Sequence, residues 1–350
     1  MIQLYYPDFW QRRGLISYAL LPLGIIFILL GFIRKLFATQ IRFNAFTLCI
    51  GNCTVGGTGK TQLIINLAKE FSDKNINFII LSKGYGGNCS APALVTSSSS
   101  PEEVGDEALE LCKYGTSFVV PSMKRAGSII AKYKPDLILV DDGMQNPHFK
   151  KDMVIMTIDG ERGFGNGLPI PAGPLRTLKS QAINFADAIL VNGTLKRKLP
   201  EISTKPIFHA EIYTDHTFAD KKYFAFAGIG NPAKFFNMLK EKGASVIETK
   251  IFPDHHQYSP SELQNLFRQA QKKKLTLITT RKDYVKIKNM DFDIETGIRP
   301  ALEYAGMAEK KYDAALPNLE FLEVSMHVKE RKDFLNMILC KFEKYMKTKC

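Results

Sequence analysis

Uncharged, mostly apolar residues form one long stretch near the N-terminus, Leu15 to Ile33 (LISYALLPLGIIFILLGFI), with two basic residues on each flank. Its length is close to the roughly 20 residues that a helix needs to cross a bilayer. A buried helix of a soluble core is the alternative, but such helices seldom lack a polar face over this length. Because no small-residue cleavage site follows, we expect residues 1–41 to be a retained membrane anchor. Whether it spans the bilayer or lies in it stays open.

Short apolar runs alternate with helical patterns after the anchor, which predicts parallel βαβ units. The runs are continuous rather than alternating, so we expect strands that are buried on both faces. They cover residues 46–50, 78–81, 118–120, 137–140, 154–158 and 188–191. The pattern predicts an α/β domain with a parallel sheet over residues 42–210.

A second set of apolar runs covers residues 223–227, 246–252 and 275–279, again with helical patterns between them. Ser259 and Glu262 have the spacing of a capping box at the start of one of these helices. A final amphipathic helix is expected over residues 327–347, with lysines on its exposed face. Residues 211–350 are therefore predicted to form a smaller α/β domain.

The net charge of +12 and the pI near 9.2 indicate an anionic partner. Nucleic acid, an anionic membrane and a phosphorylated substrate all satisfy this condition. The chain shows no nucleic-acid recognition motif, and the anchor favours a membrane, so we expect no nucleic-acid partner. The six cysteines form no CxxC pair, which argues against a zinc site or a disulfide framework.

A glycine-rich segment, GNCTVGGTGKT at residues 51–61, lies between an expected strand and an expected helix. It follows the phosphate-loop pattern G-x-x-x-x-G-K-[ST], except that Thr54 occupies the first glycine position. In such a loop, backbone N–H groups and the helix dipole enclose phosphates, the lysine reaches the β/γ oxygens, and the hydroxyl binds Mg²⁺. The glycines supply conformational freedom and close approach. The predicted ATP-binding residues are Thr54, Gly56, Gly57, Thr58, Gly59, Lys60 and Thr61.

Two adjacent acids, Asp141 and Asp142, follow the apolar run LILV. Ligands of open α/β sheets bind at the carboxyl ends of the strands, where a phosphate loop needs a metal-holding acid. A turn or a helix cap is the alternative for two acids in this position. We expect Thr61, Asp141 and Asp142 to hold Mg²⁺, with Gln145 as a weaker candidate that orients the metal shell.

Several further motifs carry a resemblance to a known family. They are LSKGYGG (81–87), VGDEALEL (104–111), GFGNGLPIPAGPLR (163–176) and FPDHHQY (252–258), together with DDGMQN, FAGIGNPAKFF and TTRKDYVK. In order and spacing, the chain resembles the tetraacyldisaccharide 4'-kinases, the lipid A 4'-kinases of Gram-negative bacteria. The resemblance extends from the N-terminal apolar stretch to about residue 290, and no single motif carries it alone.

The resemblance implies ATP- and Mg²⁺-dependent phosphorylation of the 4'-hydroxyl of an acylated glucosamine disaccharide 1-phosphate. It also implies a location at the bacterial inner membrane, among its phospholipids, with the catalytic body facing the cytoplasm. The anchor and the basic charge agree with a lipid substrate that itself carries a phosphate. Neither the residues nor the resemblance predicts an oligomeric state.

The resemblance also implies roles for individual residues. Asp106 matches the family's proposed base and His255 its partner. Lys60, which the phosphate-loop pattern places at the β/γ oxygens, is the third catalytic candidate. A carboxylate within hydrogen-bond reach of a hydroxyl can take its proton, and a histidine can orient that carboxylate. The two residues lie in different predicted domains, so domain closure is expected to complete the site. Read alone, Asp106 is equally a helix N-cap and His255 an ordinary loop histidine.

Glu107 is a candidate for contact with Mg²⁺ or the substrate. Arg176 is a candidate for contact with a phosphate of the substrate or the nucleotide, because a guanidinium pairs with phosphate in forked geometry. Two positions depart from the family pattern. Lys83 stands where the family usually has arginine, which replaces a bidentate contact by a point charge. Thr177 stands where the family usually has glutamate.

Two other classes of protein compete with the kinase interpretation. A membrane-anchored regulatory ATPase or GTPase with a deviant phosphate loop would hydrolyse nucleotide without an acceptor. The TTRKD segment has arginine at position 281, where a guanine-reading motif needs lysine. A nucleotide-gated membrane adaptor would need neither Asp106 nor His255.

Overall fold

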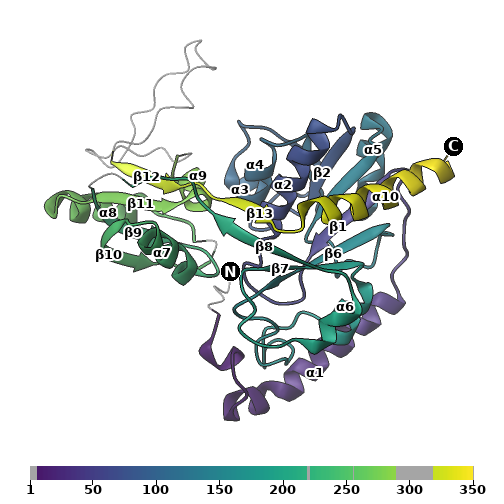
Figure 1. The fold of residues 1–350 in the computed structure, drawn as a ribbon, viewed down its shortest axis with the longest axis horizontal. Helices are drawn as coiled ribbons and strands as arrows, with labels where there is room; N and C mark the ends of the chain where they lie inside the picture. Colours follow the sequence, from purple (N-terminus) through teal and green to yellow (C-terminus); the bar gives the residue numbers. More distant parts are fainter. Residues whose placement is uncertain (1–5, 219–220, 255, 289–317, 350) are drawn as a thin grey trace. The chain divides into compact units, whose positions relative to one another are not determined.

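The computed structural model describes residues 6–218, 221–254, 256–288 and 318–349. Their contacts divide the chain into a larger unit, Tyr6–Tyr213 with Ser325–Cys350, and a smaller unit within Thr214–Val324 (Figure 1). The chain thus leaves the larger unit after Tyr213 and re-enters it at Ser325. Each unit is built around its own sheet.

The sheet of the larger unit has the strand order β13-β8-β7-β6-β1-β5-β2-β4-β3. The pairs are parallel except at the two edges, where β13 and β3 run antiparallel to their neighbours. The six predicted strands are confirmed to within two residues. The strands are β1 (Phe46–Gly51), β2 (Phe78–Ser82), β3 (Ala93–Val95), β4 (Ser117–Val119), β5 (Leu137–Asp141), β6 (Met153–Asp159), β7 (Ala188–Asn192), β8 (Ile207–Tyr213) and β13 (Ser325–Val328).

Helices cover both faces of this sheet, as its fully buried central strands require. One face packs against α2 (Lys60–Asp73), α4 (Asp106–Leu111) and α10 (Arg331–Lys349). The other face packs against α5 (Gly127–Tyr133) and α6 (Lys179–Phe185). The short helix α3 (Pro101–Val104) precedes α4. Because both faces are covered, a ligand can reach the sheet at the ends of its strands.

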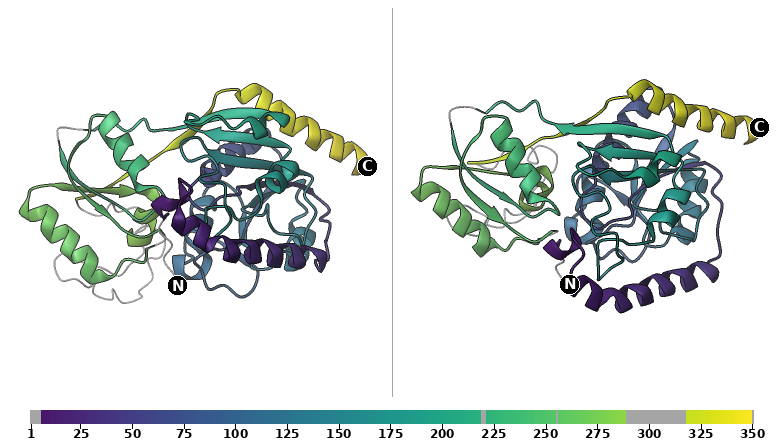
Figure 2. Two further views of the ribbon diagram at one scale, coloured as in Figure 1. Left: turned by 90° about the horizontal axis from the view of Figure 1, so that it is seen from below. Right: turned by 60° about the horizontal axis from the view of Figure 1, so that its bottom comes forward.

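The predicted N-terminal helix is confirmed as α1 (Leu15–Leu36), which follows a short 3₁₀ turn, Asp8–Trp10. It is the one helix among the described residues that is long and apolar enough to cross a membrane. In Figure 2 it runs along one side of the larger unit. A row of buried and half-buried positions repeats along it at alternating spacings of four and three residues, whereas most other side chains are exposed. These positions are Ser17, Leu21, Gly24, Ile28, Gly31 and Lys35, and we call them the seam.

The smaller unit is a four-stranded parallel sheet of order β10-β9-β11-β12. Its strands are β9 (Lys222–Ala227), β10 (Ser245–Ile251), β11 (Thr276–Thr280) and β12 (Leu319–Leu322), which confirms the three predicted runs. One face packs against α7 (Pro232–Glu241), and the other against α8 (Pro260–Lys272) and α9 (Arg281–Lys288). The capping box of Ser259 and Glu262 at the start of α8 is present.

The C-terminal segment differs from the sequence-based expectation. The helix predicted from residue 327 begins at Arg331, and His327 lies in β13. Met326 and Val328 alternate with exposed or half-buried positions and pack into the core of the larger unit, while β13 pairs with β8. Residues 325–349 therefore belong by their contacts to the larger unit, whereas the expected C-terminal domain of residues 211–350 includes them.

Candidate functional site

The glycine-rich segment lies at the carboxyl edge of the larger sheet, between the end of β1 and the start of α2. Gly59 is the N-cap of α2 and has φ +91°, and Gly56 has φ +105°, so both adopt conformations that side chains rarely tolerate. Gly57 needs no such freedom, and a Cβ there would meet nothing within 4 Å. Gly56 and Gly59 therefore need glycine for their backbone conformation, as predicted. At Gly57 the backbone does not require glycine, and the space beside it is open.

Thr54 stands at the first glycine position because the chain there is extended. It forms an antiparallel β-bridge with Leu175. On either side, the N–H of Val55 donates to the carbonyl of Pro174 at 2.9 Å, and the N–H of Arg176 donates to that of Cys53 at 2.8 Å. The PAGPLR segment therefore forms one wall of the loop and fixes its first half.

The second half of the loop is held by two neighbouring strands. The hydroxyls of Thr58 and Thr157 on β6 are hydrogen-bonded at 2.7 Å. The side chain of Asn192, the last residue of β7, donates to the carbonyl of Thr58 at 3.3 Å. A Cβ on Gly59 would lie 2.7 Å from the Asn192 amide nitrogen. Sequence reasoning missed Thr157 and Asn192, although both are polar residues at the carboxyl halves of otherwise apolar strands.

Positive charges gather around Asp142 at this edge. Its carboxylate accepts hydrogen bonds from Arg176 at 2.8 and 3.1 Å and lies 3.9 Å from the Lys60 ammonium. Burial acts to raise the pKa of the Asp142 carboxyl, but the charges of Lys60 and Arg176 outweigh burial and lower it. Burial also lowers the pKa of the nearby Lys83. The structure therefore brings the predicted phosphate-binding lysine and arginine together on one carboxylate.

The predicted metal-binding residues lie at the same carboxyl edge of the sheet. Asp141 is the buried last residue of β5 and pairs in register with Ile50 of β1, and Thr61 is the second residue of α2. Gln145 donates from its amide to the carbonyl of Asn52. Among the described residues, no group of three or more His, Cys, Asp or Glu side chains could hold a metal ion.

Asp106 is the buried first residue of α4, and the N-cap of this helix is Gly105 with φ +84°. The helix-cap alternative therefore falls on the neighbouring residue. A Cβ on Gly105 would lie 2.5 Å from the carbonyl oxygen of Tyr85, so the GYGG turn packs directly against the start of α4. Glu107 follows in the same turn and is half-buried. The structure thus joins the LSKGYGG and VGDEALEL motifs.

His255 lies outside the described residues, so its pairing with Asp106 stays a prediction. Its neighbour His256 stacks against Phe252, with ring centroids 4.8 Å apart, and contacts the Glu262 carboxylate at 3.2 Å. The carbonyl of His256 accepts a hydrogen bond from the buried Lys286. The PDHHQY and TTRKDYVK motifs therefore meet within the smaller unit.

A cavity of about 220 Å³ opens at the carboxyl end of β7 in the larger unit. Glu211 on β8 and Lys329 after β13 form an ion pair at this cavity. Sequence reasoning missed it because β8 and β13 were not predicted. Its lining residues are Gly193, Thr194, Leu195, His209, Ala210, Glu211 and Lys329.

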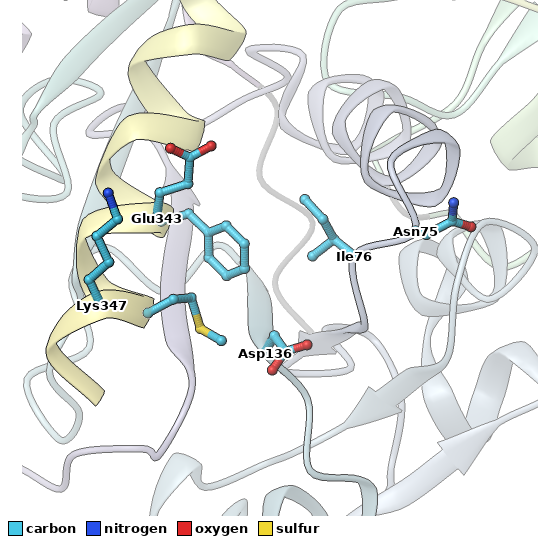
Figure 3. A pocket seen from close by; sticks show the side chains of 7 residues that line it. Asn75, Ile76, Asp136, Glu343 and Lys347 are labelled. Carbon is cyan, nitrogen blue, oxygen red and sulfur yellow. The ribbon is translucent and has the colours of Figure 1, made fainter. Parts of the chain in front are cut away.

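A second cavity, of about 440 Å³, lies at the opposite edge of the sheet (Figure 3). Asn75, Ile76 and Asp136, which precede β2 and β5, line it together with Glu343 and Lys347 of α10. It therefore lies at the amino ends of the strands, away from the phosphate loop.

Comparisons with known proteins agree on one family. The family model described as Tetraacyldisaccharide-1-P 4'-kinase (LpxK) matches residues 16–316. The tetraacyldisaccharide 4'-kinase of Rickettsia peacockii (strain Rustic) is 43% identical over 298 residues, which are 84% of this chain and 93% of that protein. The kinase of the same name from Rickettsia akari (strain Hartford) is also 43% identical over 298 residues, or 84% and 92% of the two chains.

One solved structure supports the fold. The "apo" form of LpxK from Aquifex aeolicus, crystallised in complex with ATP, superposes with a TM-score of 0.66 at 22% identity. The superposition covers 94% of this chain and 100% of the other. Together with the matching family model and the curated relatives, this leads to one conclusion: the chain belongs to the tetraacyldisaccharide-1-phosphate 4'-kinase family.

Proposed function

We propose that this protein transfers the γ-phosphate of ATP to the 4'-hydroxyl of a tetraacyldisaccharide 1-phosphate in lipid A biosynthesis. The observation that carries the proposal is the convergence of Lys60 and Arg176 on one carboxylate, Asp142, at the mouth of a phosphate loop. Two cations at this point suit the β- and γ-phosphates of a bound nucleotide. Family membership then supplies the acceptor.

ATP binding uses the loop from Thr54 to Thr61, with Lys60 and Arg176 moving from Asp142 to phosphate oxygens. Mg²⁺, when bound, would be held by Thr61 and Asp141 and would neutralise charge on the phosphates. Asp142 and Gln145 are further candidates for the metal shell. We place the nucleobase in the cavity beside β7, because Asn192 at the end of that strand contacts the loop. The cavity and the phosphate loop therefore both lie at the carboxyl edge of the sheet.

We propose that Asp106 takes the proton of the 4'-hydroxyl as the new bond to phosphorus forms. Its burial beside the GYGG turn holds the carboxylate at a fixed place on the sheet edge. His255 is proposed to orient this carboxylate, as the family motif implies. Glu107, in the first turn of the same helix, is proposed to contact the disaccharide.

We propose that α1 attaches the protein to the bacterial inner membrane while lying against the larger unit. The seam contacts the body at Ser17, Gly24 and Lys35. The opposite face exposes residues such as Leu23 (54%) and Leu30 (61%). A face of this kind suits the headgroup and acyl boundary of a bilayer. The acylated substrate is then available at the same surface, with the body in the cytoplasm.

A transfer assay tests the proposal. Purified protein is supplied with γ-labelled ATP, Mg²⁺ and detergent-dispersed tetraacyldisaccharide 1-phosphate, and the product is identified by mass. We expect one added phosphate at the 4'-position. ATP hydrolysis that is equally fast without the lipid would instead support the regulatory ATPase that the deviant loop also fits.

A further inference from the structure

Arg162 stands directly beside the phosphate loop, although no motif pointed to it. Its Nη1 atom lies 3.2 Å from the position that a Cβ on Gly56 would occupy. Gly56 is the third residue of the loop pattern that begins at Thr54. A guanidinium nitrogen therefore occupies the space into which any side chain at this loop position would project.

The backbone of Arg162 is fixed at the carboxyl edge of the sheet. Asp159 is the last residue of β6, the strand next to β1. Its carboxylate accepts hydrogen bonds from the N–H groups of Glu161 at 2.9 Å and Arg162 at 3.0 Å. The N–H of Gly163 also donates to the Asp159 carbonyl at 2.7 Å. The turn thus presents Arg162 from a rigid strand rather than from a free loop.

The side chain is supported as well. The guanidinium lies over the Tyr6 ring, with its central carbon 4.2 Å from the ring centroid. Tyr6 in turn packs edge-on against the buried Trp10, whose indole N–H donates to the carbonyl of Pro171. Stacking on a ring leaves the in-plane N–H donors of a guanidinium directed outward. The half-buried side chain is therefore held beside Gly56 of the phosphate loop.

We propose that Arg162 is a catalytic arginine that donates hydrogen bonds to the γ-phosphate oxygens during transfer. This inference rests on the proposed function. The 4'-oxygen forms a bond to the γ-phosphorus, and the bond from phosphorus to the β,γ-bridging oxygen breaks with its electron pair passing to ADP. The hydroxyl proton goes to Asp106. Arg162 stabilises the negative charge on the transferring phosphoryl group and is not itself chemically altered. Arginines supplied within the same chain have this role in other phosphoryl-transfer proteins.

Arg162 lies on a different side of the phosphate loop from Arg176 and Lys60. Both approach from the Asp142 side of the loop, whereas Arg162 approaches from the turn after β6, against Gly56. Cations on two sides of the terminal phosphate distribute its charge better than cations on one side, because charge spreads over three equatorial oxygens in the transition state.

The test compares Arg162→Ala and Arg162→Lys with Arg197→Ala. Arg197 is a suitable control because it is an exposed arginine close to Tyr6 whose guanidinium donates to the Gln11 carbonyl. We expect Arg162→Ala to lower kcat by about 10²-fold or more, the usual cost of removing one transition-state donor. Its Kd for MgATP should be unchanged, Arg162→Lys should be intermediate, and Arg197→Ala should behave as the wild type.

Two further measurements separate catalysis from folding and from binding. The wild type should bind MgADP with aluminium fluoride and the lipid more tightly than MgADP alone, and Arg162→Ala should lose this gain. Millimolar guanidinium should restore part of the kcat of Arg162→Ala, whereas urea should not. An unchanged kcat, or a Kd for MgATP that rises as much as kcat falls, would overturn the proposal. Failure of the wild type to phosphorylate the lipid would refute the proposed function instead.

Discussion

Asp142 shows how one residue prepares the site for phosphate. It is a non-glycine residue with φ +50°, a conformation that costs free energy and persists where surrounding contacts enforce it. The enforcing contacts here are the ion pairs with Arg176 and Lys60 and the hydrogen bond from its N–H to the Ile50 carbonyl. The carboxylate therefore holds in place the two cations that we propose to bind phosphate.

The lowered pKa of Asp142 gives a pH dependence of stability with a definite sign. Because the pKa in the folded protein lies below that of the unfolded chain, the carboxylate stabilises the fold fully above the unfolded value, about 3.9. This contribution is lost as the pH falls through the lower, folded pKa. We expect Asp142→Asn to unfold at lower urea concentration than the wild type at neutral pH, and the difference to shrink below about pH 4.

Urea titrations of nucleotide-free protein between neutral and acidic pH provide the measurement. Glu102→Gln is the matched control, since Glu102 is an exposed acid on α3. A gap between wild type and Asp142→Asn that stays constant over the whole range would contradict the ion-pair account.

Asp106 gives the second prediction at this scale. Replacement by asparagine keeps the shape of the side chain but removes the base, so kcat should fall by roughly 10²-fold or more. MgATP binding should be unaffected, since the phosphate loop is intact. Steady-state transfer assays and nucleotide titrations measure the two effects, with Glu102→Gln again as the control. A normal kcat would contradict the assignment of Asp106 as the general base.

At the scale of elements, the strands that could be predicted from the sequence are those that a local run of apolar residues determines. Continuous apolar runs predicted β1, β5, β6 and β7, because strands buried on both faces need apolar residues throughout. The pattern did not predict β8 or β13, because their burial alternates along the strand and depends on the partner strand.

The site divides in the same way. The loop from Thr54 to Thr61 was predictable because its chemistry is contiguous in sequence. Thr157, Asn192 and Arg162 were not, because only the sheet order brings the ends of β6 and β7 to the loop.

The seam of α1 shows why a very apolar helix need not leave the body of the protein. At Gly24, a Cβ would lie 2.9 Å from the ring of Pro169 and 3.1 Å from its carbonyl oxygen. Near the start of the helix, the Ser17 hydroxyl accepts a hydrogen bond from Asn166 at 3.2 Å. Near its end, the Lys35 ammonium donates to Gln181. Ser17, Gly24 and Lys35 thus hold one face of α1 against the larger unit, while the opposite face exposes apolar side chains.

Two glycines of α1 provide a matched test of this docking. Alanine favours a helix over glycine by about 1 kcal/mol. Gly31→Ala, where a Cβ would meet nothing within 4 Å, should therefore stabilise α1 or leave it unchanged. Gly24→Ala should instead weaken docking, because the Pro169 backbone must shift. Limited proteolysis at the α1 boundaries, together with the unfolding temperature in detergent, measures the difference. Equal behaviour of the two variants would contradict the seam.

At the scale of the whole molecule, the apolar face of α1 and the net charge of +12 both suit the membrane partner that we propose. Electrostatic attraction to anionic phospholipid would act over a distance that added salt shortens, whereas burial of the apolar face would be insensitive to salt. We therefore expect binding to anionic vesicles to weaken with added salt but to persist.

Replacing Leu23, Ile26 and Leu30 by serine should reduce vesicle binding by far more than tenfold, since burying each such side chain contributes about 1.5 kcal/mol or more. All three are more than half exposed, so the fold of the larger unit should be retained. Co-sedimentation measures binding, and circular dichroism checks the fold. Binding that survives the triple substitution would assign membrane attachment to charge alone.

The orientation of α1 in the membrane is testable in the same vesicles. A helix held along its seam by Ser17, Gly24 and Lys35 has both ends on the side of the body, because crossing the bilayer would break these contacts. Protease added outside vesicles that carry bound protein should then remove an N-terminal tag and a C-terminal tag at similar rates. Protection of the N-terminal tag alone would mean that α1 leaves the seam and crosses the bilayer. The substrate would then have to reach the phosphate loop without help from a helix lying at the membrane surface.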